Sequence, residues 1–131
     1  MSIKDRVEAE INKVLKEREY QHKSLNREYE RGLGVLSPVY NACKELEKEY
    51  GGTKSRGKNE YCLKFELKDL VCQIHYGQQN DVALSTIRFY PGENDKVLVQ
   101  YTGRFANDKE EIVLHERAVE MAIRFVAEEL A

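Results

Sequence analysis

Apolar and polar side chains alternate in four consecutive segments of this 131-residue chain. In residues 61–67 every second side chain is apolar, and residues 70–76 repeat the pattern. Alternation with a period of two is typical of a β-strand with one buried face. A turn at Lys68-Asp69 would pair residue 67 with residue 70 and would place the apolar side chains of both segments on one face. The sequence therefore predicts an antiparallel hairpin.

A second hairpin is predicted over residues 82–90 and 96–105. The two segments flank residues 91–95, a cluster of turn-forming side chains with the sequence PGEND. Placing Phe89 opposite Val97 brings the apolar side chains of both segments onto one face. Because four contiguous strands with short turns pair in sequence order, we expect a four-stranded antiparallel sheet of two hairpins over residues 59–105.

Residues 1–50 are predicted to be helical. Apolar side chains recur at three- and four-residue spacing through residues 2–31, a stretch without Gly or Pro. Gly32 and Gly34 predict the end of this long helix. Ser37-Pro38 predicts the start of a short second helix, which would run to about Glu49 before two further glycines.

The last segment, residues 107–131, predicts a C-terminal helix over about residues 108–130. Asn107 is a suitable N-cap, with Glu110 three residues further on. The chain is therefore expected to be one α+β domain, residues 1–131. Its order is a long helix, a short helix, a four-stranded antiparallel sheet and a C-terminal helix, with the helices packed on one face of the sheet.

The composition favours a cytoplasmic protein without a membrane span. Cys43, Cys62 and Cys72 are an odd number with no CxxC spacing, and the first residues have no apolar run like that of a signal peptide. The formal net charge of −2 excludes a strongly basic nucleic-acid binder. Cys43 and Cys72 lie on apolar faces and are expected in the core. The spacing of the three histidines suggests no metal site, and we expect no metal and no cofactor.

The long helix carries an apolar stripe that needs a partner. At about 1.5 Å per residue, a helix over residues 2–31 is roughly 45 Å long, whereas a compact domain of this size is about 35–40 Å across. The stripe is interrupted at Arg18 and His22. The side chains before the interruption are expected either at an interface with a second subunit or folded back on the chain's own sheet. They are Val7, Ile11, Val14 and Leu15.

The opposite face of the predicted sheet is polar and favours cations. Because two arginines can hold a carboxylate or phosphate bidentately, this face is a candidate site for an anionic ligand. The basic loop at residues 51–58 can steer such a ligand electrostatically. An ordinary half-exposed sheet and a solvated linker are the alternatives. The candidate residues are Lys64, His75, Arg88 and Arg104 on the sheet, with Glu66 nearby, and Lys54, Arg56 and Lys58 in the loop.

The predicted register also sets Cys62 opposite His75. Such a pair can form the activated thiolate of a cysteine enzyme. No third residue is evident to orient the imidazole, so we predict no catalytic residue.

These features favour a non-enzymatic protein-binding module that forms a homodimer and acts as an inhibitor, an antitoxin or immunity protein, or a chaperone. In size, mild acidity and element order the chain resembles small secretion chaperones, which act as dimers, although it lacks the helix that they place between their strands. The alternative is a binder of an anionic small molecule or nucleic acid through the polar sheet face. RNA-binding sheets usually add stacking aromatic side chains, which favours the small anion slightly.

Overall fold

The computed structural model describes residues 2–56, 59–77, 83–103 and 108–131. It divides into one unit that ends at Arg31 and another that begins at Gly32. The long first helix is α1 (Ile3–Tyr50), and the C-terminal helix is α2 (His115–Leu130). With the antiparallel sheet between them in sequence, these elements confirm the predicted α+β class.

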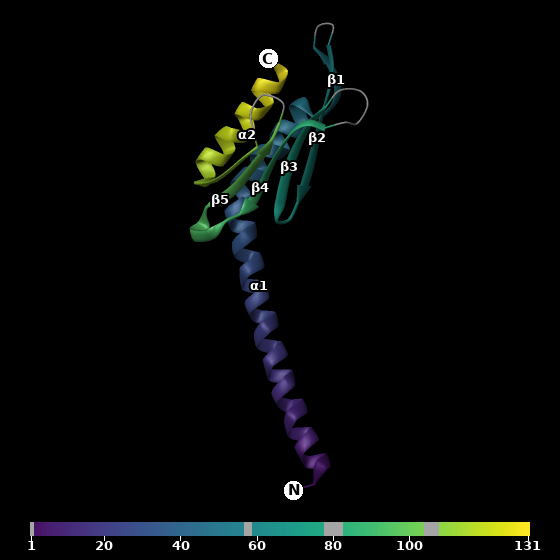
Figure 1. Cartoon of the computed structure of the whole chain (residues 1–131), viewed down its shortest axis with the longest axis vertical. Helices are drawn as coiled ribbons and strands as arrows, with labels where there is room; N and C mark the ends of the chain where they lie inside the picture. The colour runs from purple at the N-terminus through teal and green to yellow at the C-terminus, as the bar shows by residue number, and fades with distance from the viewer. Residues whose placement is uncertain (1, 57–58, 78–82, 104–107) are drawn as a thin grey trace. The chain divides into compact units, whose positions relative to one another are not determined.

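The sheet has six strands in the described part of the chain, where the sequence predicts four. Each strand is antiparallel to the next, and spatial order follows chain order. A short 3₁₀ turn (Glu93–Asp95) joins the fourth strand to the fifth. Most of the strands can be followed in Figure 1. They are β1 (Gly52–Arg56), β2 (Asn59–Lys68), β3 (Val71–Gly77), β4 (Ala83–Pro91), β5 (Val97–Thr102) and β6 (Lys109–Val113).

Both predicted hairpins are present, but the predicted register of each is wrong by two residues. In the first, Leu67 pairs with Cys72, because the turn lies at Asp69-Leu70 rather than one residue earlier. In the second, Phe89 pairs with Val99 rather than with Val97. Since side chains alternate with a period of two, a shift of two residues leaves every side chain on its predicted face.

The two edge strands lie where the sequence predicts other structures. β1 occupies most of the predicted basic loop, and β6 occupies the start of the predicted C-terminal helix, which instead begins at His115. The sequence of β6, KEEIV, contains good helix formers, and its strand conformation is stabilised by pairing with β5 from Val97↔Val113 to Tyr101↔Lys109. Asn107, the predicted N-cap, lies outside the described residues.

α1 is one continuous helix where the sequence predicts two. Gly32 does not end it: a Cβ there would lie 2.9 Å from Leu70 Cδ2 and 3.2 Å from Pro91 Cγ, so glycine allows the close approach of these side chains. Pro38 lies inside the helix and has no N–H to donate to a preceding carbonyl. The helix ends at Tyr50, close to its predicted end, and Gly52 then adopts a φ of 90°, which favours glycine.

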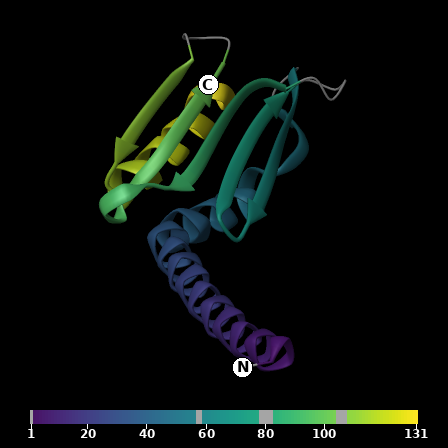
Figure 2. The same cartoon turned by 60° about the horizontal axis from the view of Figure 1, so that its bottom comes forward.

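The core of the second unit lies between the helices and one face of the sheet. Figure 2 shows α2 and the C-terminal part of α1 on the same side of the strands. Cys43 and Cys72 are fully buried there, as predicted. A hydrogen bond with Cys72 and burial both raise the pKa of the Cys43 thiol, so it stays protonated. The core side chains are Val35, Leu36, Val39 and Cys43 of α1, Ala118, Ala122, Phe125, Val126 and Leu130 of α2, and Tyr61, Leu63, Cys72, Ile74, Tyr76, Ile87, Phe89, Val97 and Val99 of the sheet.

Candidate functional site

The first candidate surface is the apolar stripe of α1 between residues 3 and 31. Every residue from 2 to 31 is exposed, including apolar side chains that a globular core would bury. Ile3 is 79% exposed, Leu25 is 64% exposed and Ile11 is 47% exposed. Val7, Val14 and Leu15, the other predicted interface residues, are exposed as well.

This stripe follows an eleven-residue repeat that the predicted three- and four-residue spacing did not resolve. Eleven residues in three turns is about 3.67 residues per turn, close to the 3.6 of an α-helix, so the repeat stays on one face of a nearly straight helix. Arg18 and His22, the polar residues that interrupt the stripe, also occupy positions of this repeat, so they lie within the stripe rather than beside it. Its three rows are Ile3, Val14 and Leu25; Val7, Arg18 and Tyr29; and Ile11 and His22.

The arrangement can bind another helix. An amphipathic helix is stabilised mainly by packing of its apolar face, because propensity alone gives marginal stability in water. Contiguous exposed apolar side chains with polar flanks are typical of protein–protein interfaces. The stripe of the first unit is therefore a candidate surface for binding another helix.

The second candidate surface is the face of the sheet opposite the core. Lys64, His75 and Arg88 lie on it, as the predicted parity requires, and Lys64 pairs with His75 across β2 and β3. Arg104, the fourth predicted residue, lies outside the described part of the chain. The structure thus brings three of the four predicted side chains onto one face.

These three side chains contact polar neighbours on the same face. Glu66 Oε1 lies 3.8 Å from Lys64 Nζ and 3.9 Å from His75 Nε2. Arg88 Nε donates to Gln73 Oε1 at 3.2 Å. Glu66 therefore offsets part of the positive charge that made this face a candidate for anions.

His75 is partly enclosed on this face, with its side chain 19% exposed. Its Nδ1 lies 3.0 Å from Thr86 Oγ1, within hydrogen-bonding distance. Burial lowers the pKa of His75 below its ordinary value of 6.5; the Glu66 carboxylate opposes this effect, whereas Arg88 and Lys64 add to it. The lowered pKa favours the neutral imidazole, which adds no positive charge for an anion.

The structure adds residues to this face that the sequence did not predict there. Gln100 Nε2 donates to Glu110 Oε2 at 3.0 Å, which brings a second carboxylate onto the face from β6. At the other end of the strands, Tyr90 pairs with Leu98 and Leu98 pairs with Ile112, which is largely exposed. The face is therefore part polar and part apolar. Glu110 and Ile112 were missed because their segment is predicted as a helix.

The predicted Cys62–His75 pair is wrong. Cys62 pairs with Gly77, and His75 pairs with Lys64, because the turn between β2 and β3 lies one residue later than predicted. Cys62 and His75 are diagonal neighbours, a relation that usually separates Cβ atoms by about 7 Å. The structure therefore does not place His75 where it could activate the Cys62 thiolate, as a cysteine enzyme would require.

Of the three candidate residues in the predicted basic loop, Lys54 is the one whose side chain is described. Lys54 Nζ donates to the backbone carbonyl of Glu49 at 2.6 Å. Because carbonyls at the C-terminal end of a helix lack helical donors, this contact stabilises the end of α1. The side chain of Arg56 and the whole of Lys58 lie outside the described residues.

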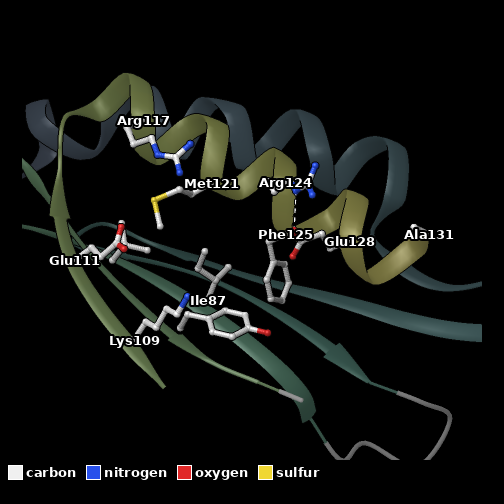
Figure 3. Close-up of a pocket in the computed structure, with 11 residues that line it drawn as sticks. Ile87, Lys109, Glu111, Arg117, Met121, Arg124, Phe125, Glu128 and Ala131 are labelled. Carbon is white, nitrogen blue, oxygen red and sulfur yellow. Dashed lines mark hydrogen bonds and ion pairs between the residues drawn. The ribbon is translucent and has the colours of Figure 1, made fainter. Parts of the chain in front are cut away.

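A groove of about 670 Å³ between α2 and the strands β4–β6 is a third surface, which the sequence did not predict. Figure 3 shows it with Met121 and Phe125 of α2 above Ile87 of the sheet. Two charged side chains of β6, Lys109 and Glu111, line this groove. They lie on the sheet face that carries apolar side chains in the central strands. Inward-pointing charges on an edge strand also discourage pairing with another sheet, which explains them without a ligand.

Comparison with known proteins suggests no role for this chain, so a role has to be inferred from the three surfaces described above. No family model, curated protein or solved structure matches this chain. Among the described residues, no three His, Cys, Asp or Glu side chains gather in a way that could hold a metal ion. Neither α1 nor α2, over the part of the chain that the structure describes, is long and apolar enough to cross a membrane.

Proposed function

We propose that this chain is a non-enzymatic, cytoplasmic protein-binding module that forms a homodimer through residues 3–31 of α1. The observation that supports this proposal is the exposure of the whole apolar stripe, with Ile3, Ile11 and Leu25 between 47% and 79% exposed. Burial of each such side chain contributes about 1.5–3 kcal/mol when it is complete. A second copy of the same stripe offers a partner of matching length and polarity.

Light scattering after size-exclusion chromatography tests the homodimer. We expect wild type to have twice the chain mass of 15.3 kDa. Ile11→Asp places a charge in the stripe and should shift the protein to the monomer mass, with a weaker helix signal in circular dichroism at 222 nm because residues 3–31 lose the packing of their apolar face. Asn12→Asp is the matched control, because it adds the same charge one residue along the helix and off the stripe; it should remain a dimer. A wild-type monomer at millimolar concentration would refute the proposal.

The second candidate function is binding of a small anion, or of nucleic acid, by the polar face of the sheet. Arg88 and Lys64 on one face of the sheet support it, whereas Glu66 and Glu110 weaken it. Nucleoside phosphates and inorganic phosphate should then raise the melting temperature of wild type by several degrees. Arg88→Glu should remove that rise, and Arg124→Glu on α2 should retain it. An unchanged melting temperature with every phosphate compound would rule this candidate out.

A further inference from the structure

The charges beside the apolar stripe are distributed unevenly along α1. One flank carries Lys4, Glu8, Glu19 and Glu30. The other flank carries Arg6, Glu10, Glu17 and Glu28. In each of these sets the cation lies at the N-terminal end and a carboxylate lies at the C-terminal end, while Lys13 and Lys23 beside the flanks pair with Glu10 and Glu19 of the same helix.

A parallel pair of these helices would bring like charges together. In a parallel pair each flank faces the opposite flank of the other helix, so Glu17 would meet Glu19 and Glu28 would meet Glu30. Lys4 and Arg6 would also meet each other, and Arg6 with Glu8 would be the one opposite-charge contact of comparable offset. Opposed like charges destabilise helix pairing, as the flanking charges of coiled coils show.

An antiparallel pair brings opposite charges together at both ends of the pair instead, with one like-charge contact, Glu17 against Glu17, at the twofold axis. Each flank then faces the same flank of the other helix in reverse order, so Lys4 meets Glu30 and Arg6 meets Glu28. Both ion pairs form in the same alignment of the two helices, because in each pair the two residue numbers add up to 34. In the same register Val7 of one copy lies between Leu25 and Tyr29 of the other, whereas Val14 lies between Arg18 and His22.

We propose that the stripe is covered by a second copy of this chain in antiparallel orientation, with Lys4 and Arg6 of each copy against Glu30 and Glu28 of the other. The inference rests on the homodimer proposed above and adds its orientation and register. Twofold symmetry produces each contact twice, so the dimer has four such ion pairs. Exposed ion pairs contribute about 0.2–1 kcal/mol each, which together affects affinity measurably.

Charge exchange within the helix tests the orientation. Lys4→Glu/Arg6→Glu should raise the dimer dissociation constant about tenfold or more at low salt, because four attractions become repulsions. Adding Glu28→Lys/Glu30→Lys to the same chain should restore the wild-type value. Loss of helix would not explain the weaker dimer, since acidic residues near a helix N-terminus stabilise the helix. A parallel dimer would respond differently: both variants would match wild type.

Disulfide cross-linking tests the register of the two helices independently. In a Cys62→Ser background, a Lys4→Cys chain mixed with a Glu30→Cys chain should form a mixed disulfide under mild oxidation, and the Lys4→Cys chain alone should not cross-link. In a parallel dimer Lys4 faces Arg6 instead, so a mixed disulfide between a Lys4→Cys chain and an Arg6→Cys chain would overturn the antiparallel arrangement and leave the homodimer standing. A wild-type monomer in the scattering experiment would overturn both.

Discussion

The two parts of α1 carry apolar side chains on the same helix and bury them to different extents. Between residues 32 and 50, Leu36 is 1% exposed and packs in the core with Val39. Between residues 3 and 31, Leu25 is 64% exposed. The comparison shows that an apolar stripe specifies an amphipathic helix but does not specify what covers it. For the C-terminal part the cover is the sheet of the same chain, and for the N-terminal part we infer a second chain.

Two identical substitutions should show this contrast most strongly. Leu36→Ala removes a buried side chain and should lower the free energy of unfolding by about 2–5 kcal/mol. Leu25→Ala removes an exposed one and should change it by less than about 0.5 kcal/mol in the monomer. Urea denaturation at a concentration below the dimer dissociation constant measures both. Equal losses from the two variants would break the comparison.

Glycine substitutions can locate where the buried part of α1 begins. At Gly34 a Cβ would meet no atom within 4 Å, so Gly34→Ala should stabilise the chain by roughly 0.5–1 kcal/mol through helix propensity alone. At Gly32 the added Cβ would force Leu70 and Pro91 to shift, and Gly32→Ala should destabilise the chain by about 1 kcal/mol. Thermal unfolding of both variants would show opposite shifts in melting temperature. Stabilisation by Gly32→Ala would mean that the packing there is looser than described.

Acid should act on the sheet-bearing unit through His75, an effect smaller than those above. Because the folded pKa is lowered, the unfolded state binds more protons between that pKa and about 6.5. The stabilisation that the neutral His75 contributes to the folded state is therefore complete above the pKa of the unfolded state. It is lost as the pH falls through the lower pKa of the folded state. Urea denaturation between pH 7.5 and pH 5 should show a larger loss for wild type than for His75→Gln. Glu66, Lys64 and Arg88 face the imidazole, so they must remain unchanged in this comparison.

The sequence predicts the faces of the sheet better than its register. Alternation assigns every described side chain from Tyr61 to Tyr76 to a face, and this assignment survives because each hairpin is displaced by an even number of residues. The register itself depends on the position of the turn. Asp69-Leu70 carries no Asn-Gly or Asp-Gly signal that would have fixed it.

The elements that the sequence missed have little apolar content of their own. β1 has the sequence GTKSR and β6 the sequence KEEIV, and neither alternates clearly. Their conformation is stabilised by pairing with β2 and β5, an interaction between segments that local propensity does not reveal. Gly32 was misread for the related reason that its neighbours, Leu70 and Pro91, are distant in sequence.

The candidate surfaces also differ in how well the sequence predicts them. Val7, Ile11, Val14 and Leu15 could be selected from periodicity alone, because helical spacing is local. The polar face required side chains from several strands, so parity found Lys64, His75 and Arg88 but could not find Glu110, whose strand was unrecognised. Periodicity cannot distinguish a stripe covered by the chain itself from one covered by another chain. The exposed fractions of the two parts of α1 support our inference that a second chain covers residues 3–31.

Hydrogen–deuterium exchange at several protein concentrations tests the difference between the two parts of α1 most directly. We expect protection of the amides of residues 3–31 to rise with protein concentration, as the second copy covers the stripe. Protection of residues 35–50 should stay constant, because their cover belongs to the same chain. Protection of residues 3–31 that is the same at every concentration would contradict the account.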